Sequence, residues 1–159
     1  MKKKIYIYGS ILFLGDFLIK LLIKNMMNIL ESITVIPNFF SITYVINDGA
    51  AFSILKGKQI FLILLASIFL FFLIYSIKEE KLTKYKMIYY SFLIGGIFGN
   101  LVDRIIYNGV IDYLDFQIFI YDAPIFNLAD IFIFIGIVLI LLEGGEYGNR
   151  IFRKRYTNW

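Results

Sequence analysis

Four long apolar stretches constrain the fold more than any other feature of this sequence. Each comes close to the length of about 20 residues that an α-helix needs to cross a bilayer. They cover residues 5–23, 60–77, 87–106 and 125–142. Hydrophobic residues make up 60% of the 159 residues, more than an ordinary soluble domain can bury. We therefore expect a mainly α membrane protein, in which residues 1–159 form a single integral membrane domain with four transmembrane helices.

The distribution of lysine and arginine predicts how these helices are oriented. Cytoplasmic flanks of membrane spans are rich in basic residues, and three of the polar segments in this chain stand out in that way. Those segments contain Lys2, Lys3, Lys4, Lys78, Lys81, Lys84, Lys86, Arg150, Arg153, Lys154 and Arg155. Both termini are therefore expected in the cytoplasm, with extracytoplasmic segments at about residues 25–58 and 107–124. The net charge of +4 reflects this asymmetry. Because the basic residues are divided among three segments at the membrane edge and form no single patch, we expect no nucleic-acid partner.

The sequence contains neither cysteine nor histidine, and this absence removes several classes of site. A thiol nucleophile, a disulfide framework, a histidine general base and a Cys/His metal cage are all excluded. Any chemistry must therefore come from Asp, Glu, Lys, Ser or Tyr side chains. We expect neither a metal nor another cofactor.

The first extracytoplasmic segment has the composition of a small β-rich element. Residues 33–36 and 39–46 are rich in β-branched and aromatic side chains, and a Pro-Asn turn at 37–38 lies between them. These patterns predict a strand pair that lies on the membrane surface. The polar run 47–49 then ends the second strand, and residues 50–55 are expected to form a short helix.

Two aspartates stand where apolar stretches meet the outer membrane surface. Asp112 follows the third stretch, and Asp130 lies in the first turns of the fourth, which runs antiparallel to the third. Both carboxylates therefore belong to the same outer-leaflet layer. Burying an ionisable group at that depth costs free energy, and such groups are often functional. Either aspartate alone, however, is equally well explained as a solvated residue at the membrane interface without a role.

The pair of carboxylates suits aspartic proteolysis. Like charges a few ångströms apart cannot both ionise cheaply, so two aspartates can share one proton. The ionised member then acts as a base on water, while the protonated member polarises the scissile carbonyl. Because a helix N-terminus favours negative charge, we expect Asp130 to be ionised and Asp112 to be protonated.

Polar residues in the third stretch are expected to support this pair. Gly95 and Gly99 form a small-residue face that lets a neighbouring helix approach closely. Asn100 and Asp103 share a helix face, whereas the neighbours Asp103 and Arg104 point in different directions and need separate partners. We interpret these residues as a polar network that holds the helix bundle together and supports the site.

Asp16 and Lys20 in the first stretch have the i,i+4 spacing of a helical ion pair. An unpaired charge near mid-membrane is costly, so a self-neutralising structural pair is our preferred interpretation. The alternative is a Ser–Lys dyad in which Lys20 acts as the base. The serines on the appropriate side are Ser32, Ser41 and Ser53.

Three further positions have both a functional and a local explanation. Asn47 could hydrogen-bond a substrate backbone and Gly49 permits a left-handed turn, but a plain strand-ending turn explains both equally well. Asn127 is a candidate capping residue a few positions after Pro124, near the start of the fourth helix.

Four short blocks, in this order and with this topology, resemble the lipoprotein signal peptidases (signal peptidase II), a family of bacterial membrane aspartic proteases. The blocks are N-x-G-A-A-F from Asn47, G-N-x-x-D-R from Gly99, V-x-D from Val110 and F-N-x-A-D from Phe126. The resemblance covers nearly the whole chain and implies that Asp112 and Asp130 are the catalytic dyad. It also implies that further polar residues of the blocks shape the site and bind substrate or lipid. These are Asn47, Asn100, Asp103, Arg104 and Asn127.

The same resemblance implies the substrate, the partners and the location. It implies cleavage of the signal peptide from a prolipoprotein, just before a diacylglyceryl-modified cysteine. Prolipoproteins and membrane lipids are the expected partners. We expect a monomer in the bacterial cytoplasmic (inner) membrane, with the active site at the outer leaflet. Two positions depart from the family pattern, because Ile19 replaces the threonine before Lys20 and Tyr113 replaces a phenylalanine after Asp112.

Two other functions would use the acidic residues differently. A small proton-coupled transporter would relay protons through the membrane depth, yet only Asp16 is expected to lie deep. Its relay would consist of Asp16, Asp103, Asp112 and Asp130. Transporters also commonly contain internal repeats, and none is visible in the sequence. A metal-dependent phosphoryl transferase would hold magnesium with Asp112 and Asp115, a short motif that gives it little support.

Overall fold

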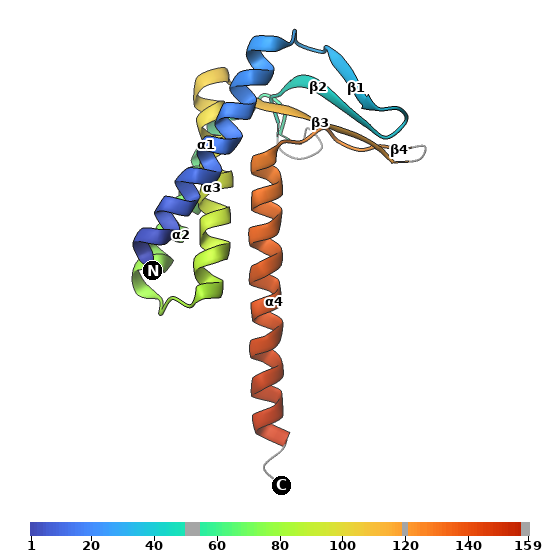
Figure 1. The fold of residues 1–159 in the computed structure, drawn as a ribbon. Coiled ribbons are helices and arrows are strands. Elements are labelled where there is room, and N and C mark those ends of the chain that lie inside the picture. Colours follow the sequence, from blue (N-terminus) through green and yellow to red (C-terminus); the bar gives the residue numbers. More distant parts are fainter. Residues whose placement is uncertain (50–54, 119–120, 157–159) are drawn as a thin grey trace.

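The computed structural model describes residues 1–49, 55–118 and 121–156 (Figure 1). It is mainly helical, with a small β-sheet at one end of the helices. The helices are α1 (Lys2–Met26), α2 (Gln59–Glu79), α3 (Lys84–Tyr107) and α4 (Leu128–Tyr156). The strands are β1 (Ser32–Ile36), β2 (Phe40–Asn47), β3 (Val110–Ile118) and β4 (Tyr121–Asp122).

Within the described residues, helices α1 and α2 are long and apolar enough to cross a membrane. Many of their large apolar side chains are exposed, among them Ile7, Leu18, Ile60 and Phe71. Exposed apolar surface of this extent suits contact with lipid, because soluble proteins rarely leave such patches open to water. The mainly helical class expected from the sequence is confirmed.

The other two expected spans, residues 87–106 and 125–142, fall in α3 and α4. The third stretch lies entirely within α3. Helix α4 begins at Leu128, three residues after the expected start, because Asn127 caps the helix. It then continues well past the expected end.

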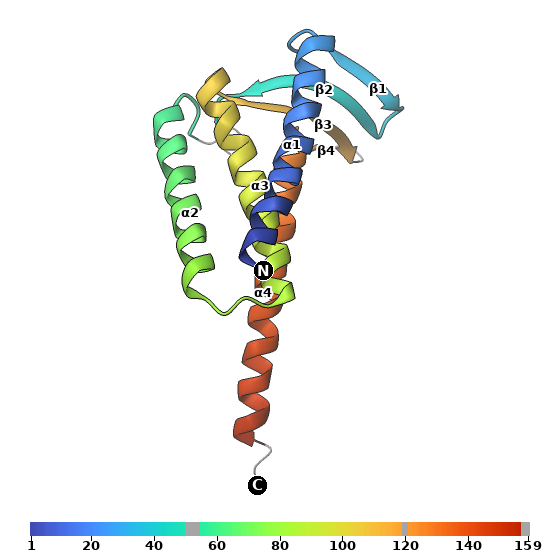
Figure 2. The same cartoon turned by 60° about the vertical axis from the view of Figure 1, so that its left-hand side comes forward.

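Helix α3 lies at the centre of the helical part and packs on α1, α2 and α4 (Figure 2). Glycines allow the closest approach to α1. A Cβ atom on Gly95 would lie 2.8 Å from Cβ of Leu12 and 2.9 Å from the carbonyl oxygen of Gly9. A Cβ atom on Gly99 would lie 2.8 Å from Oδ2 of Asp16. The predicted small-residue face is therefore confirmed as the contact of α3 with α1.

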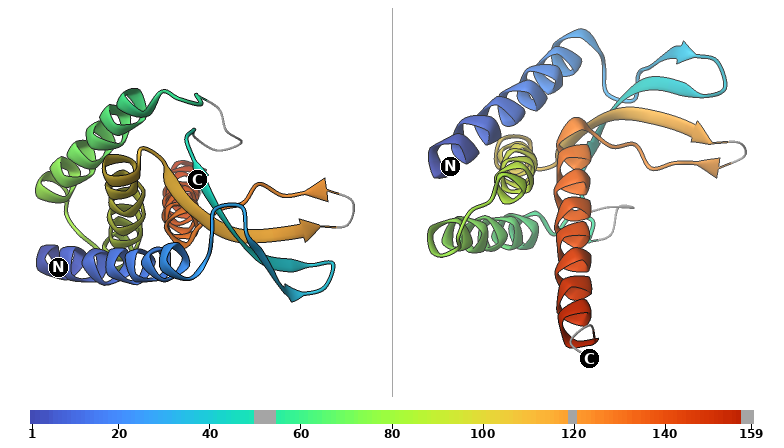
Figure 3. Two further views of the ribbon diagram at one scale, coloured as in Figure 1. Left: turned by 90° about the horizontal axis from the view of Figure 1, so that it is seen from above. Right: turned by 60° about the horizontal axis from the view of Figure 1, so that its bottom comes forward.

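The sheet has the strand order β1-β2-β3-β4, and each neighbouring pair is antiparallel. The predicted strand pair is confirmed as the β1–β2 hairpin, in which Asn38 has a φ of 58° at the turn. Strands β3 and β4 are additional to that pair, and Figure 3 shows the strands extending to one side of the helices. The short helix expected over residues 50–55 falls mostly on 50–54, which lie outside the described residues.

A buried cluster fixes the sheet on the end of α1. Met27, which follows α1, packs with Tyr44 of β2 and with Ile111 and Tyr113 of β3. Side chains alternate between the two faces of a strand, so Asp112 points to the opposite face of β3 from this cluster. The sheet therefore presents Asp112 away from the apolar packing that anchors it.

The chain returns alongside β3 before it enters α4. The N–H of Phe126 donates to the carbonyl oxygen of Leu114 at 3.1 Å, and the N–H of Leu114 donates to the carbonyl oxygen of Phe126 at 2.8 Å. Asn127 alone separates this bridge from the first residue of α4. The first turn of α4 is thereby held beside the part of β3 that contains Asp112.

Candidate active site

Asp112 lies on β3 opposite Val45 of β2 and is 2% exposed. Two asparagine side chains donate to its carboxyl group. Nδ2 of Asn47 lies 2.9 Å from Oδ2, and Nδ2 of Asn127 lies 2.6 Å from Oδ1. Because a buried polar group without partners is costly, these two donors are what makes a carboxyl group tolerable at this place.

Asp130 lies in the first turn of α4, where it forms a capping box with Asn127. The N–H of Asp130 donates to Oδ1 of Asn127 at 3.0 Å, and the N–H of Asn127 donates to Oδ2 of Asp130 at 3.2 Å. Oδ1 of Asp130 accepts from Nδ2 of Asn100 at 2.7 Å. The predicted capping role of Asn127 is confirmed, and the residues that begin α4 also fix one of the two candidate carboxylates.

Both aspartates line one cavity of about 750 Å³. Its polar lining also includes Asn47, Asn100 and Arg104. The apolar wall includes Val45, Ile46, Phe126, Ile133, Phe134 and Ile137. A large cavity with a few polar groups gathered at one place is typical of a site that holds and converts an apolar ligand.

Two of the asparagines are held so that their NH2 groups face Asp112. Oδ1 of Asn47 accepts from the N–H of Gly49 at 2.9 Å, and Oδ1 of Asn127 accepts from the N–H of Asp130. A backbone N–H can only donate, so the atom that it contacts must be the amide oxygen. The other end of each amide, which donates, is therefore directed at the carboxyl group of Asp112.

Arg104 ties the polar turn after β2 to α3. Its Nη2 donates to the carbonyl oxygen of Gly49 at 3.2 Å, and its Nη1 donates to that of Asn100 at 3.3 Å. Its Nε has no hydrogen-bond partner within the described residues. As predicted, Arg104 and its neighbour Asp103 have separate partners, since Asp103 contacts Lys20 instead. A guanidinium group thus lines the same cavity as the two aspartates.

The predicted ion pair of Asp16 and Lys20 is present, but it is not self-contained. Nζ of Lys20 lies 2.8 Å from Oδ2 of Asp16 and 2.9 Å from Oδ2 of Asp103. It also donates to Oδ1 of Asn100 at 2.9 Å. Oδ1 of Asp16 accepts from the N–H of Ala129, in the first turn of α4, at 3.0 Å. The expectation that Asp16 stands apart from the other acidic residues is therefore wrong, because it belongs to the network beside the cavity.

The Ser–Lys alternative gains no support from the described residues. The ammonium group of Lys20 is buried against two carboxylates and an amide oxygen. The hydroxyl of Ser32 hydrogen-bonds instead with that of Thr43 at 2.7 Å. Ser41 lines a different cavity, and Ser53 lies outside the described residues.

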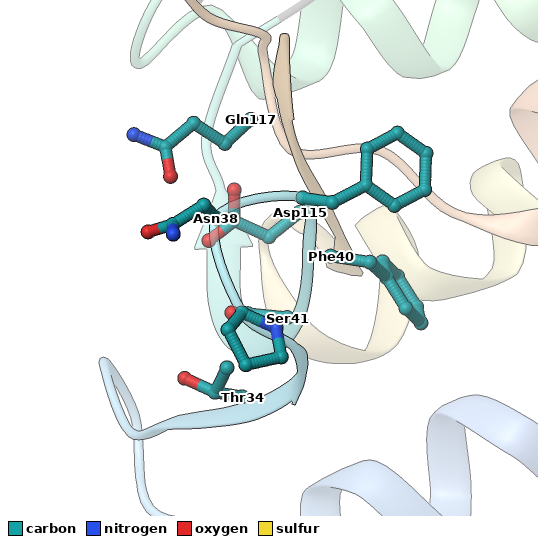
Figure 4. Close-up of a pocket in the computed structure, with 8 residues that line it drawn as sticks. Thr34, Asn38, Phe40, Ser41, Asp115 and Gln117 are labelled. Atoms are coloured by element: carbon teal, nitrogen blue, oxygen red, sulfur yellow. The ribbon is translucent and has the colours of Figure 1, made fainter. Parts of the chain in front are cut away.

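This second cavity, of about 440 Å³, lies beside the turn of the β1–β2 hairpin and contains Asp115 in its lining (Figure 4). Oδ2 of Asp115 accepts from Oγ1 of Thr43 at 2.6 Å. Asp112 lines the larger cavity instead. Among the residues that the structure describes, no group of three or more Asp, Glu, His or Cys side chains could hold a metal ion. The magnesium site suggested by the spacing of Asp112 and Asp115 therefore gains no support.

The environment of Asp112 raises its pKa to about 7. Burial is the main cause, because it penalises the charged form, and the negative charge of Asp130 adds to the effect. The amide donors of Asn47 and Asn127 act in the opposite direction without cancelling it. Asp112 is therefore protonated in mildly acidic solution.

We expect the rate of peptide cleavage, measured as kcat/KM, to fall as the pH rises above about 7. If Asp112 gives its proton to the scissile carbonyl, as the resemblance implies, it loses that proton above this value and the rate should drop about tenfold for each further pH unit. Initial rates across a pH series in detergent, with circular dichroism recorded at each pH, measure this. A rate that stays constant far into the alkaline range would contradict the acid role of Asp112.

Two backbone contacts and the apolar wall of the larger cavity were not predicted. The N–H of Ile111 donates to Oδ2 of Asp103 at 3.1 Å, and the N–H of Ala129 donates to Asp16. Such contacts leave no signal in a sequence, because every residue except proline supplies the same N–H. The wall did leave a signal, since Ile133 and Ile137 recur at helical spacing on α4.

Comparison with known proteins identifies the family. A model of the family described as signal peptidase (SPase) II matches residues 9–145. The lipoprotein signal peptidase of Staphylococcus haemolyticus is 40% identical to this chain over 148 residues, covering 89% of this chain and 94% of that protein. The lipoprotein signal peptidase of Staphylococcus aureus is 40% identical over 148 residues, covering 89% of this chain and 91% of that protein.

Two solved structures of bacterial membrane enzymes have the same fold. One, determined by the in meso method at 2.3 Å resolution, has a TM-score of 0.81 and 33% identity, covering 98% of this chain and 91% of that chain. The other, determined by the same method at 1.9 Å resolution, has a TM-score of 0.78 and 36% identity, covering 87% and 90%. With the family match and the relatives, these likenesses show that the chain belongs to the signal peptidase II family.

Proposed function

We propose that this protein removes signal peptides from diacylglyceryl-modified prolipoproteins by cleaving before the lipid-modified cysteine. Membership of the signal peptidase II family makes it an aspartic-type signal peptidase. The relatives that are named lipoprotein signal peptidases support the substrate class. A small proton-coupled transporter is not favoured, because its acidic residues would spread through the membrane, whereas here they gather at one cavity and the network beside it.

One observation supports the proposed chemistry above all: Asp112 and Asp130 come from different elements and line the same cavity. Asn127 joins them, because its side chain donates to Asp112 and accepts from the N–H of Asp130. The raised pKa of Asp112 favours its protonated form. A pair of this kind can share a single proton, as aspartic proteolysis requires.

In the proposed reaction Asp130 is the base and Asp112 is the acid. Asp130 accepts a proton from a water molecule as the water oxygen attacks the scissile carbonyl carbon, and Asp112 gives its proton to the carbonyl oxygen. The C–N bond of the resulting tetrahedral intermediate then breaks as Asp130 passes its proton to the leaving nitrogen. A hydroxyl proton of the intermediate returns to Asp112, which restores the starting dyad.

We assign supporting roles to the other polar residues of the site. Asn47, Asn100 and Asn127 hold the two carboxyl groups, as their hydrogen bonds suggest. Arg104 lines the cavity and donates to the carbonyl oxygen of Gly49, so we assign both to binding of the substrate backbone or the lipid. Asp103 supports the site from behind through Lys20.

We further propose four membrane spans, with both termini in the cytoplasm and the cavity at the outer leaflet of the bacterial cytoplasmic membrane. The N-terminal end of α1 and the C-terminal end of α4 both lie away from the sheet (Figure 1), which supports this orientation. The basic segments flank the same side of the helices. A monomer in this position would meet a substrate that is anchored by its lipid in the outer leaflet.

The absence of cysteine allows a direct test of this topology. In the variant Ile29→Cys the thiol occupies an exposed position, and we expect it to react with a membrane-impermeant maleimide on intact cells. The thiol of Lys81→Cys, between α2 and α3, should react only after the cells are permeabilised. The reverse pattern would overturn the proposed orientation.

The proposed function is tested with the purified protein and a diacylglyceryl-modified prolipoprotein. A gel shift should show loss of the signal peptide, and EDTA should leave the rate unchanged, because no metal takes part in the proposed steps. The same precursor without its lipid is the control and should remain uncut. A lipidated precursor that stays intact would overturn the proposal.

A further inference from the structure

Lys20 is a buried lysine of α1 whose ammonium group has contacts in three directions. It is 1% exposed. Its Nζ atom lies within ion-pair distance of the carboxylates of Asp16 and Asp103 and donates a hydrogen bond to Oδ1 of Asn100. Ion pairing alone would require only the carboxylates. The third contact, with an amide 80 residues away in the sequence, therefore calls for a separate explanation.

The contact with Lys20 determines how the amide of Asn100 is oriented. An ammonium group has donors and no acceptor, so the atom of Asn100 that faces Lys20 must be Oδ1. Nδ2 of Asn127 also points at this oxygen, at 3.2 Å. The NH2 group at the other end of the amide is then left to donate to Asp130 at 2.7 Å. A flipped amide would place its oxygen against the carboxylate, which is repulsive.

The other two asparagines of the site do not depend on a side chain in this way. Asn47 and Asn127 are oriented by backbone N–H groups, which a substitution of the neighbouring side chain leaves in place. Among these three, the orientation of Asn100 is the one that is set by a charged side chain. A single substitution at Lys20 therefore removes the charged donor to Oδ1 of Asn100 and leaves the neutral, longer contact from Asn127.

We propose that Lys20 is a positioning residue for the reaction: it fixes the amide of Asn100 so that the NH2 group donates to Asp130. This inference deepens the proposed function and rests on it. Without Lys20 the amide keeps only the neutral donor of Asn127 at 3.2 Å, so its hydrogen bond with Asp130 is held less firmly. Lys20 is not among the described residues that line the cavity, so its loss should lower kcat and leave KM nearly unchanged.

The test is a double-mutant cycle on the lipidated precursor. We expect Lys20→Met to lower kcat about 10- to 100-fold. A loss of this size is typical when a residue that orients a functional side chain is removed. Because Lys20 acts through Asn100, the double variant Lys20→Met/Asn100→Ala should lie within about threefold of Asn100→Ala alone. Lys24→Met is the matched control and should keep the wild-type kcat. Nζ of Lys24 lies 4.2 Å from the ring centre of Tyr107, outside the network.

A second set of variants keeps the test decisive if Lys20→Met does not fold. Lys20→Met leaves two buried carboxylates without their cation, which is costly. Adding Asp103→Asn restores the formal charge of the cluster to its wild-type value of −1, because two carboxylates and one ammonium become one carboxylate. The cycle with Asn100→Ala is then repeated in the Asp103→Asn background, with the same expected result.

The possible outcomes distinguish a failure of the positioning role from a failure of the proposed function. If the losses from Lys20→Met and Asn100→Ala multiply, or if Lys20→Met raises only KM, the positioning role is overturned while the peptidase stands. If the wild-type protein leaves the lipidated precursor uncut, the proposed function is overturned and the inference with it.

Discussion

Asparagine in place of either Asp112 or Asp130 should abolish cleavage of a lipidated prolipoprotein. In the proposed reaction the first supplies the proton for the scissile carbonyl, and the second is the base for the water. General acid or base catalysis by one residue contributes about 10²–10⁴-fold, so kcat should fall by roughly 10³-fold or more. The gel shift, followed over long incubations with each variant, measures the residual rate.

A substitution at another aspartate of the same strand controls for nonspecific loss of activity. Asp115→Asn makes the same chemical change on β3, but this residue lines the other cavity and should retain the wild-type rate. Asparagine is close to aspartate in size and can still accept a hydrogen bond, so both dyad variants should fold and extract from the membrane normally. Cleavage at the wild-type rate by Asp112→Asn or Asp130→Asn would end the dyad hypothesis.

Alanine in place of Gly96 should lower stability and activity together. Its Cβ would lie 2.5 Å from the carbonyl oxygen of Ala129 and 2.8 Å from Cγ1 of Ile133, both in α4. A backbone atom cannot rotate out of the way, so α4 must move off α3. Overpacking of this kind costs roughly 1–3 kcal/mol. It also displaces the residue before Asp130, and a shift of about 1 Å at a catalytic group can cost about 10²-fold in rate.

Thermal unfolding in detergent and kcat/KM on the lipidated precursor measure the two effects. Gly15→Ala in α1 is the matched control, because a Cβ there meets nothing within 4 Å. Alanine is favoured over glycine in a helix by about 1 kcal/mol, so this variant should be at least as stable as the wild type and equally active. A Gly96→Ala protein with the same properties would mean that the contact between α3 and α4 does not place Asp130.

The helices and the first hairpin could be predicted because their signals are local. Apolar length marks α1 and α2, and the turn residues at 37–38 separate two β-rich runs. Strand β3 had no comparable signal, since Asp112, Asp115 and Gln117 interrupt its apolar alternation. It exists because β2, far earlier in the chain, supplies the backbone partners. Pairing at that distance is decided by tertiary packing and not by local propensity.

The candidate site divides in the same way. Asp112, Asp130 and Asn127 could be singled out because acidic and capping residues at the ends of apolar stretches are chemically conspicuous. The link from Lys20 to Asn100 could not be anticipated. A local partner at i,i+4 already satisfies the spacing rule, and only the packing of α1 on α3 brings the amide within reach.

The capping box at the start of α4 has a consequence for how such a protein can evolve. Asn127 and Asp130 are under two selective pressures at once. The side-chain atoms that cap the helix also belong to the candidate active site. A substitution at either position therefore weakens the start of α4 as well as the site, so selection for the fold and selection for the activity preserve the same residues.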